Sequence, residues 1–110
     1  MGQALQRAGT LLSSALVGST KLVIVVTASG GNGCSPSALS AATTLKGSGA
    51  LVAVVTPLAA TATTFSACTY PQKAFAMMQS AATSGLFYGG VSISEMGNKL
   101  GEVLADACAL

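Results

Sequence analysis

Two short apolar runs with a helical pattern between them dominate the first half of the chain. Residues 21–27 and 50–55 are rich in Val, Ile and Leu, and runs of this length and composition are typical of buried strands. Between the two runs, Leu39, Ala42 and Leu45 recur at helical spacing. The order strand, helix, strand over residues 21–55 predicts a parallel strand pair joined by a crossover helix.

The ends of this helix carry specific signals. Ser35 is expected to cap it, and Pro36 is expected to take the first helical position, where proline is well tolerated. Gly47 or Gly49 is expected to end it. The residues before the cap, 29–35, are predicted to form the turn that follows the first strand.

The second half of the chain has a weaker pattern. A helix is predicted from Pro71 to a cap at Gly85, then a strand that starts at Leu86 and ends at two glycines, and then a helix over residues 94–109 capped by Ser94. The residues expected to face the core are Phe75, Met78 and Ala82 of the first of these helices and Met96, Leu100, Val103, Leu104 and Ala107 of the last. Together the elements predict an α/β fold over residues 21–110: a small three-layer, Rossmann-like domain with a mostly parallel sheet of three to four strands.

Residues 1–20 differ from the rest. They contain Arg7, no acidic residue and several Ser and Thr residues, and four leucines fall at helical spacings: Leu5, Leu11, Leu12 and Leu16. This basic amphipathic pattern is typical of a mitochondrial presequence, and a secretory signal peptide is the competing interpretation. If the segment is retained, we expect it to be an amphipathic docking helix.

Composition narrows the possible functions. Apolar residues make up 51% of the chain and charged residues only 7%, against about 25% in average soluble domains. We therefore expect much of the surface to be covered by protein subunits of a larger complex, or by a membrane. The net charge of +2, without a basic cluster, argues against nucleic acid.

Candidate chemistry is sparse. The chain has no histidine, and its three cysteines lie far apart, so the sequence supports neither a catalytic triad nor a metal site. We predict that the protein is not an enzyme and has no catalytic, cofactor-binding or metal-ligating residues. Glu102 and Asp106 lie one helical turn apart, a spacing more typical of a solvated or partner-facing patch than of a catalytic pair.

Two glycine turns and two uncharged stretches leave alternatives open. Residues 30–33 (GGNG) and 89–92 (GGVS) could present backbone N–H groups to a nucleotide phosphate, although neither matches a known phosphate-binding spacing. Tight turns and close packing between strand and helix are the simpler interpretations. Two long stretches, residues 22–45 and 47–72, contain no charged residue. Residues 47–66 could therefore also enter a membrane, as part of a small integral membrane subunit.

Several short motifs resemble one known family. The run Leu22-Val23-Ile24, the helix end AATTLKG at residues 41–47, the turn GGVS at 89–92 and the segment GNKL at 97–100 are similar to the N-terminal domain of the electron transfer flavoprotein alpha subunit. The departures are a shortened interval over residues 56–85, Glu102-Val103 in place of the family's Pro-Arg, and no flavin-binding domain within these 110 residues.

The resemblance implies a specific role. It indicates a shortened flavoprotein-alpha-like domain without a cofactor, serving as a non-catalytic accessory subunit of a mitochondrial electron-transfer assembly. Such a subunit would associate with a membrane through a membrane-bound complex.

Overall fold

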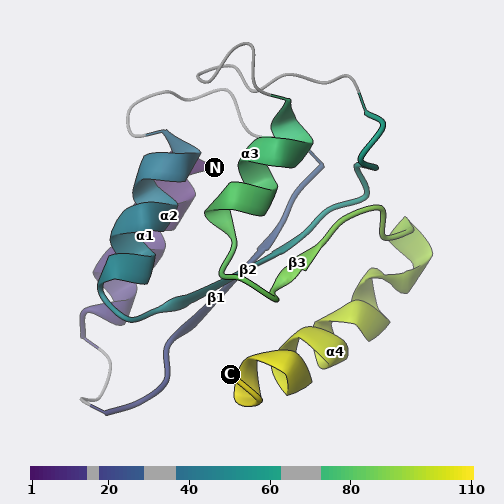
Figure 1. Ribbon diagram of the computed structural model, residues 1–110. Coiled ribbons are helices and arrows are strands. Elements are labelled where there is room, and N and C mark those ends of the chain that lie inside the picture. The colour runs from purple at the N-terminus through teal and green to yellow at the C-terminus, as the bar shows by residue number, and fades with distance from the viewer. Residues whose placement is uncertain (15–17, 29–36, 63–72) are drawn as a thin grey trace.

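The computed structural model describes residues 1–14, 18–28, 37–62 and 73–110. These residues form an α/β domain with helices on both faces of a parallel sheet (Figure 1). The elements are α1 (Gly2–Leu12), β1 (Leu22–Val26), α2 (Ala38–Gly47), β2 (Leu51–Val55), α3 (Ala74–Ala81), β3 (Phe87–Tyr88), a 3-10 turn (Ile93–Glu95) and α4 (Met96–Cys108).

The strands of the sheet lie side by side in chain order, β1-β2-β3, and all described pairs are parallel. Leu22 is paired with Leu51 and Val26 with Val55, and Val55 is in turn paired with Tyr88. The predicted strand–helix–strand unit over residues 21–55 is therefore confirmed. Three to four strands were predicted, and the described part of the chain forms three.

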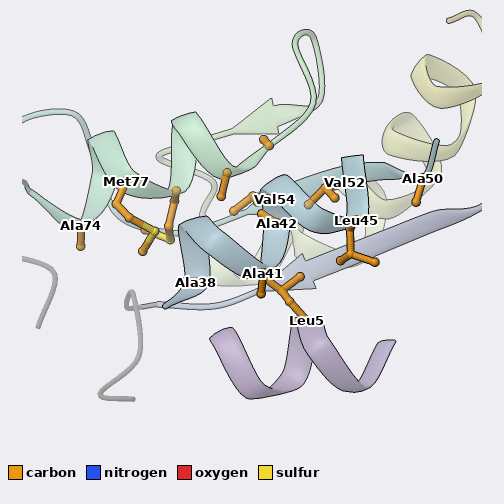
Figure 2. Packing of buried hydrophobic residues seen from close by; sticks show 13 residues of the cluster. Leu5, Ala38, Ala41, Ala42, Leu45, Ala50, Val52, Val54, Ala74 and Met77 are labelled. Atoms are coloured by element: carbon orange, nitrogen blue, oxygen red, sulfur yellow. The ribbon is translucent and has the colours of Figure 1, made fainter. Parts of the chain in front are cut away.

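One face of the sheet carries the larger core. Val52 and Val54 of β2 point to this side, because alternate residues of a strand face opposite ways. The other buried residues of the cluster, which Figure 2 shows, come from helices α1, α2 and α3 and from the residues that follow α2 and α3: Leu5, Ala38, Ala41, Ala42, Leu45, Ala50, Ala74, Met77, Met78, Ala81 and Ala82. We call this side the covered face.

The opposite side of the sheet carries a smaller cluster, and α4 is the helix that packs on it (Figure 1). Val103 and Ala107 of α4 are buried against Ala53 and Val55 of β2. Leu86 and Val91, on either side of β3, complete the buried set. The molecule thus has helix, sheet and helix layers, with unequal helical cover on the two sides.

Helix α1 packs on α2 and contributes to the core. Leu5 is 1% exposed and points from α1 toward Ala41 of α2 in Figure 2. Helix α1 is therefore part of the domain's own packing, and whether residues 1–20 are a presequence or a docking segment stays a prediction.

The first half of the chain departs from prediction at two points. Strand β1 is half-buried rather than buried, and Val26 is 52% exposed, because β1 lies at an edge of the sheet. Helix α2 begins at Ala38, with Ser37 as its cap: the Ser37 hydroxyl accepts a hydrogen bond from the Ser40 N–H at 3.1 Å. The predicted cap Ser35 and Pro36 lie outside the described residues.

The C-terminal end of α2 matches the sequence prediction. The helix ends at Gly47, and Gly49 has φ +92°, a left-handed conformation that glycine adopts without steric cost. The chain then enters β2 at Leu51.

Helix α3 ends earlier than predicted, at Ala81 rather than near Gly85. The reason is Thr83, which bonds to β2 on both its backbone and its side chain. Its N–H donates to the Val52 carbonyl at 2.7 Å, and its hydroxyl accepts from the Val52 N–H at 2.9 Å. The predicted start at Pro71 lies outside the described residues.

The core residues predicted for α3 are largely confirmed. Met78 and Ala82 are buried, and Met77 joins them. Phe75 is partly buried and packs edge-on against Phe87, with ring centroids 5.0 Å apart.

Helix α4 differs most from prediction. It begins at Met96 after the 3-10 turn, and Ser94 does not cap it. Val103 and Ala107 are buried as predicted, but Leu100 is 36% and Leu104 53% exposed. The prediction that both leucines face the core is wrong, because no neighbouring helix in the described chain covers that flank of α4.

Candidate functional site

The carboxyl ends of parallel strands are the usual ligand sites of open α/β sheets, and both predicted glycine turns follow such ends. Residues 30–33, after β1, lie outside the described residues. Residues 89–92, after β3, are described, so their capacity to bind an anion is open to inspection.

Two of the four backbone N–H groups in the turn at residues 89–92 are already used within the protein. The Gly90 N–H donates to the Leu58 carbonyl at 2.7 Å, and the Val91 N–H donates to the Thr56 carbonyl at 3.1 Å. These N–H groups close the turn onto the end of β2. They are not directed at a ligand.

Gly89 has a packing role in the same turn. A Cβ atom at this position would lie 2.5 Å from Cε2 of Phe75, a distance that real Cβ contacts do not reach. Glycine is therefore needed to let the end of β3 approach α3. The structure thus shows the close packing between strand and helix that was the simpler interpretation of this turn.

The end of β2 is also satisfied internally. Thr56 is the buried polar side chain of the described residues, and its hydroxyl accepts a hydrogen bond from the Leu58 N–H at 3.2 Å. The hydroxyl of Thr56 thus helps to close the turn after β2, and it is buried away from solvent.

A polar cluster joins α4 to β3. The Tyr88 hydroxyl donates to the Asp106 carboxylate at 2.6 Å, and the Lys99 ammonium donates to Glu102 at 2.8 Å. The same ammonium lies 5.7 Å from the centre of the Tyr88 ring. Glu102 and Asp106, considered as a carboxylate pair in the sequence, thus serve two different partners.

The cluster shifts two pKa values. Burial and, after it, the hydrogen bond to Asp106 raise the pKa of Tyr88 to about 12. The hydrogen bond to Glu102 raises the pKa of Lys99. Both shifts keep the groups in the state they have at neutral pH, so the cluster holds α4 in place and supplies no acid or base for chemistry.

The groove between α1 and α2 is a second polar region. It encloses about 590 Å³ and has Leu5, Ala41 and Leu45 among its lining residues. Its hydroxyls bond to their own helices: Thr10 donates to the Gln6 carbonyl and Thr44 to the Ser40 carbonyl. These hydroxyls therefore act within each helix, as serine and threonine often do.

Apolar side chains remain exposed beside α4. Leu22, Ile24 and Val26 of β1 are paired with Leu51, Ala53 and Val55, whose side of the sheet is the one that α4 covers. At 100° per residue, Leu100 and Leu104 lie on the flank of α4 opposite Lys99 and Asp106. Because Asp106 binds Tyr88 of β3, the flank with the leucines faces β1.

We call this surface the open face and define it by Leu22, Ile24, Val26, Leu100 and Leu104. Val26 and Leu104 are each more than half exposed, and Leu100 is 36% exposed. The open face contains no charged residue. The charged residues of α4, Lys99 and Glu102 of the ion pair and Asp106 bonded to Tyr88, lie on the other flank of the helix. The sequence pattern identified the two leucines as apolar but assigned them to the core.

Metal and membrane chemistry find no support in the described residues. They contain no group of three or more acidic, His or Cys side chains placed to hold a metal ion. Of the cysteines, Cys108 is free and exposed on α4, and Cys34 and Cys68 lie outside the described part. No described helix combines the length and apolar character needed to cross a bilayer, and residues 51–55 of the second uncharged stretch form β2.

Comparison with known proteins finds no match among family models, curated proteins or solved structures. The likeness to the flavoprotein alpha subunit therefore stays a prediction from sequence motifs.

Proposed function

We propose that this protein is a non-catalytic interaction module that joins other protein subunits through the open face. The observation that carries the proposal is the unequal cover of the sheet. Three helices contribute to the core of the covered face, whereas α4 is the described helix on the other side. Leu100, Leu104 and Val26 are left exposed beside it.

The shape of the open face suits a helix of a partner. Strands lie about 4.8 Å apart and packed helices about 8–10 Å apart, so a helix set next to α4 would lie over β1. There it would contact Ile24 from above and Leu104 from the side. Because the open face carries no charge, the contacting side of the partner is expected to be apolar.

Composition supports the same role. Only 7% of residues are charged, and exposed apolar patches on a protein of this kind commonly mark sites of protein association. We further propose that the fold of this domain is Rossmann-like. The parallel strand order β1-β2-β3 supports this proposal.

The sequence resemblance supports a location. We propose that the module is an accessory subunit of a mitochondrial electron-transfer assembly. The full chain with a fluorescent protein at its C-terminus is expected to colocalise with a mitochondrial marker. A diffuse signal would remove the mitochondrial part of the proposal and leave the interaction module standing.

The assembly itself is tested by molar mass. The tagged full chain, isolated from cells of its natural source under non-denaturing conditions, is expected to run as a particle well above its own 10.7 kDa. Leu104→Lys is expected to release the chain from that particle, because it places a charge in the apolar contact.

A matched control uses the covered side of the molecule. Thr43 is exposed on α2, so Thr43→Lys adds the same charge far from the open face and is expected to leave the particle intact. Recovery of the native chain as a 10.7 kDa monomer, or equal behaviour of the two variants, would contradict the proposed function.

A further inference from the structure

Strand β1 pairs with β2 along one edge, and its other edge has no partner strand in the described part of the chain. The Leu51 N–H donates to the Lys21 carbonyl at 2.8 Å, and the Thr27 N–H donates to the Val55 carbonyl at 3.1 Å. Because the backbone groups of alternate strand residues point to the same side, Val23 and Val25 also face β2. The N–H and C=O groups of Leu22, Ile24 and Val26 therefore point away from the sheet, and they have no hydrogen-bond partner in the described chain.

A groove of about 400 Å³ runs along this strand. One wall is formed by β1 and the residue that follows it: Val23, Ile24, Val25, Val26 and Thr27. The other wall is formed by α1 and its N-cap: Met1, Ala4, Leu5 and Ala8. Neither wall carries a charged side chain.

We propose that this groove binds an extended, uncharged segment of a partner protein, which adds to the sheet as a strand beside β1. The proposal names the kind of partner for the interaction module, and it rests on that proposed function for the role of docking. The groove shares Ile24 and Val26 with the open face but is bordered by α1 instead of α4, so a substitution on α1 and one at Leu104 test the two proposals separately.

The chemistry of the groove selects an extended segment. Three alternate residues of β1, namely Leu22, Ile24 and Val26, offer outward-pointing backbone donors and acceptors at strand spacing, and only another strand can satisfy all of them. A partner helix satisfies its backbone groups internally and would leave those of β1 unpaired. The apolar walls favour small apolar side chains, such as alanine and valine, on the side that meets α1.

A second copy of the chain suits the groove less well. Antiparallel pairing of β1 with its own copy would form one continuous sheet and bring the α1 helix of the copy to the same side of that sheet. That helix would compete for the space in which α1 already borders the groove. A segment that carries no helix on that side avoids this conflict.

Strand β1 also lacks the features that normally protect an edge. Exposed edge strands usually carry lysine or proline, which block the addition of another strand. Residues 22–28 (LVIVVTA) contain neither. Lys21 stands before the strand and the groove lining.

Amide hydrogen exchange tests the proposal residue by residue. The probe is a short synthetic peptide of alternating valine and alanine with serines at both ends, added to the isotope-labelled full chain. In the free chain the amides of Leu22, Ile24 and Val26 are expected to exchange fast and those of Val23 and Val25 slowly. Saturating peptide is expected to slow the first three by about tenfold or more.

Three results would overturn the proposal. One is the absence of added protection at these three amides with millimolar peptide. Another is equal protection by a peptide that carries proline at its centre. A third is protection of the three amides in the peptide-free chain that falls on dilution, because a second copy would then be the occupant.

Matched variants locate the groove. Ala4 is exposed and lines the groove, and its neighbour Gln3 is exposed and does not line it. Ala4→Glu is expected to weaken binding of the peptide about tenfold by placing a carboxylate against the apolar wall, whereas Gln3→Glu is expected to leave it unchanged. Equal affinities of the two variants would contradict the placement.

The variants also separate this proposal from the proposed function. Leu104→Lys is expected to disturb the native particle without changing affinity for the peptide. Ala4→Glu is expected to raise the peptide concentration needed for amide protection about tenfold while the apolar contact at Leu104 persists.

Discussion

The two faces of the sheet share one central strand and differ in how that strand is covered. On the covered face, Val52 and Val54 are fully buried beneath helices that meet them from several directions. On the other face, Ala53 and Val55 are as deeply buried, with α4 as the covering helix among the described residues, but the side chains beside them on β1 are not buried. The burial of β2 therefore does not show whether the neighbouring strand β1 is covered on the same face.

The difference has an energetic meaning. Each Å² of apolar surface removed from water contributes about 25 cal/mol, so the covered face supplies most of the stabilisation that this small domain obtains from its own chain. The open face retains apolar surface that a partner can still bury. The following predictions would break or sharpen this contrast.

The largest effect is expected in the core of the covered face. Met78 is fully buried there, and Met78→Ala should lower the free energy of unfolding by about 2–5 kcal/mol. The matched change on the open face, Leu104→Ala, should alter it by less than about 0.5 kcal/mol. Chemical denaturation of both variants measures the difference, and similar losses would mean that Leu104 is buried in the free chain.

A smaller loss is expected at the contact between β3 and α3. Because a Cβ at position 89 would lie 2.5 Å from the Phe75 ring, Gly89→Ala should destabilise the protein by about 1–3 kcal/mol. Gly89→Ala combined with Phe75→Leu should recover part of the loss by removing the ring atom in conflict. Thermal unfolding of both variants measures the two losses. If the double variant recovered no stability, the result would contradict this packing.

The opposite sign is expected on α4. A Cβ at Gly97 would meet no atom within 4 Å, and alanine is a better helix former than glycine. Gly97→Ala should therefore raise the free energy of unfolding by up to about 1 kcal/mol. A clear loss of stability in the isolated chain would show that the flank is less open than the structure indicates.

The smallest effect concerns the bond that holds α4 to β3. The pKa of Tyr88 is raised to about 12, so the stabilisation linked to its proton is fully present below about pH 10 and is lost as the pH rises toward 12. Asp106→Asn should move the pKa back toward 10. Ultraviolet titration of tyrosinate, in a Tyr70→Phe background, measures the midpoint. An unchanged midpoint would mean that the hydrogen bond to Asp106 contributes nothing.

Sequence patterns predicted the interior of the sheet well and its margins poorly. The run at residues 51–55 is β-branched throughout most of its length and bounded by glycine and proline, so its strand was identified. The start of α2 was missed because Ser35 and Ser37 are both good caps, and the bond from Ser40 selects the second. The end of α3 was placed too late because it is set by the hydrogen bond between Thr83 and Val52. Helical spacing in the sequence does not predict such a contact between distant residues.

The candidate surfaces were harder to foresee. The helical pattern of α4 identified an apolar stripe that includes both Val103 and Leu104, but only the number of neighbouring helices decides which of them is buried. The bond between Tyr88 and Asp106 joins residues 18 positions apart, and neither residue signals the other. The free edge of β1 followed from the strand order, which the sequence left open.

The strand order has a consequence for how the chain is made. Synthesis proceeds from the N-terminus, and here each new strand adds to the strand made just before it, β2 onto β1 and then β3 onto β2. The nascent sheet can therefore grow from a single side as the chain emerges from the ribosome. The edge that has no partner strand among the described residues belongs to the first strand synthesised, β1, so a binding segment could reach it before α4 has been translated.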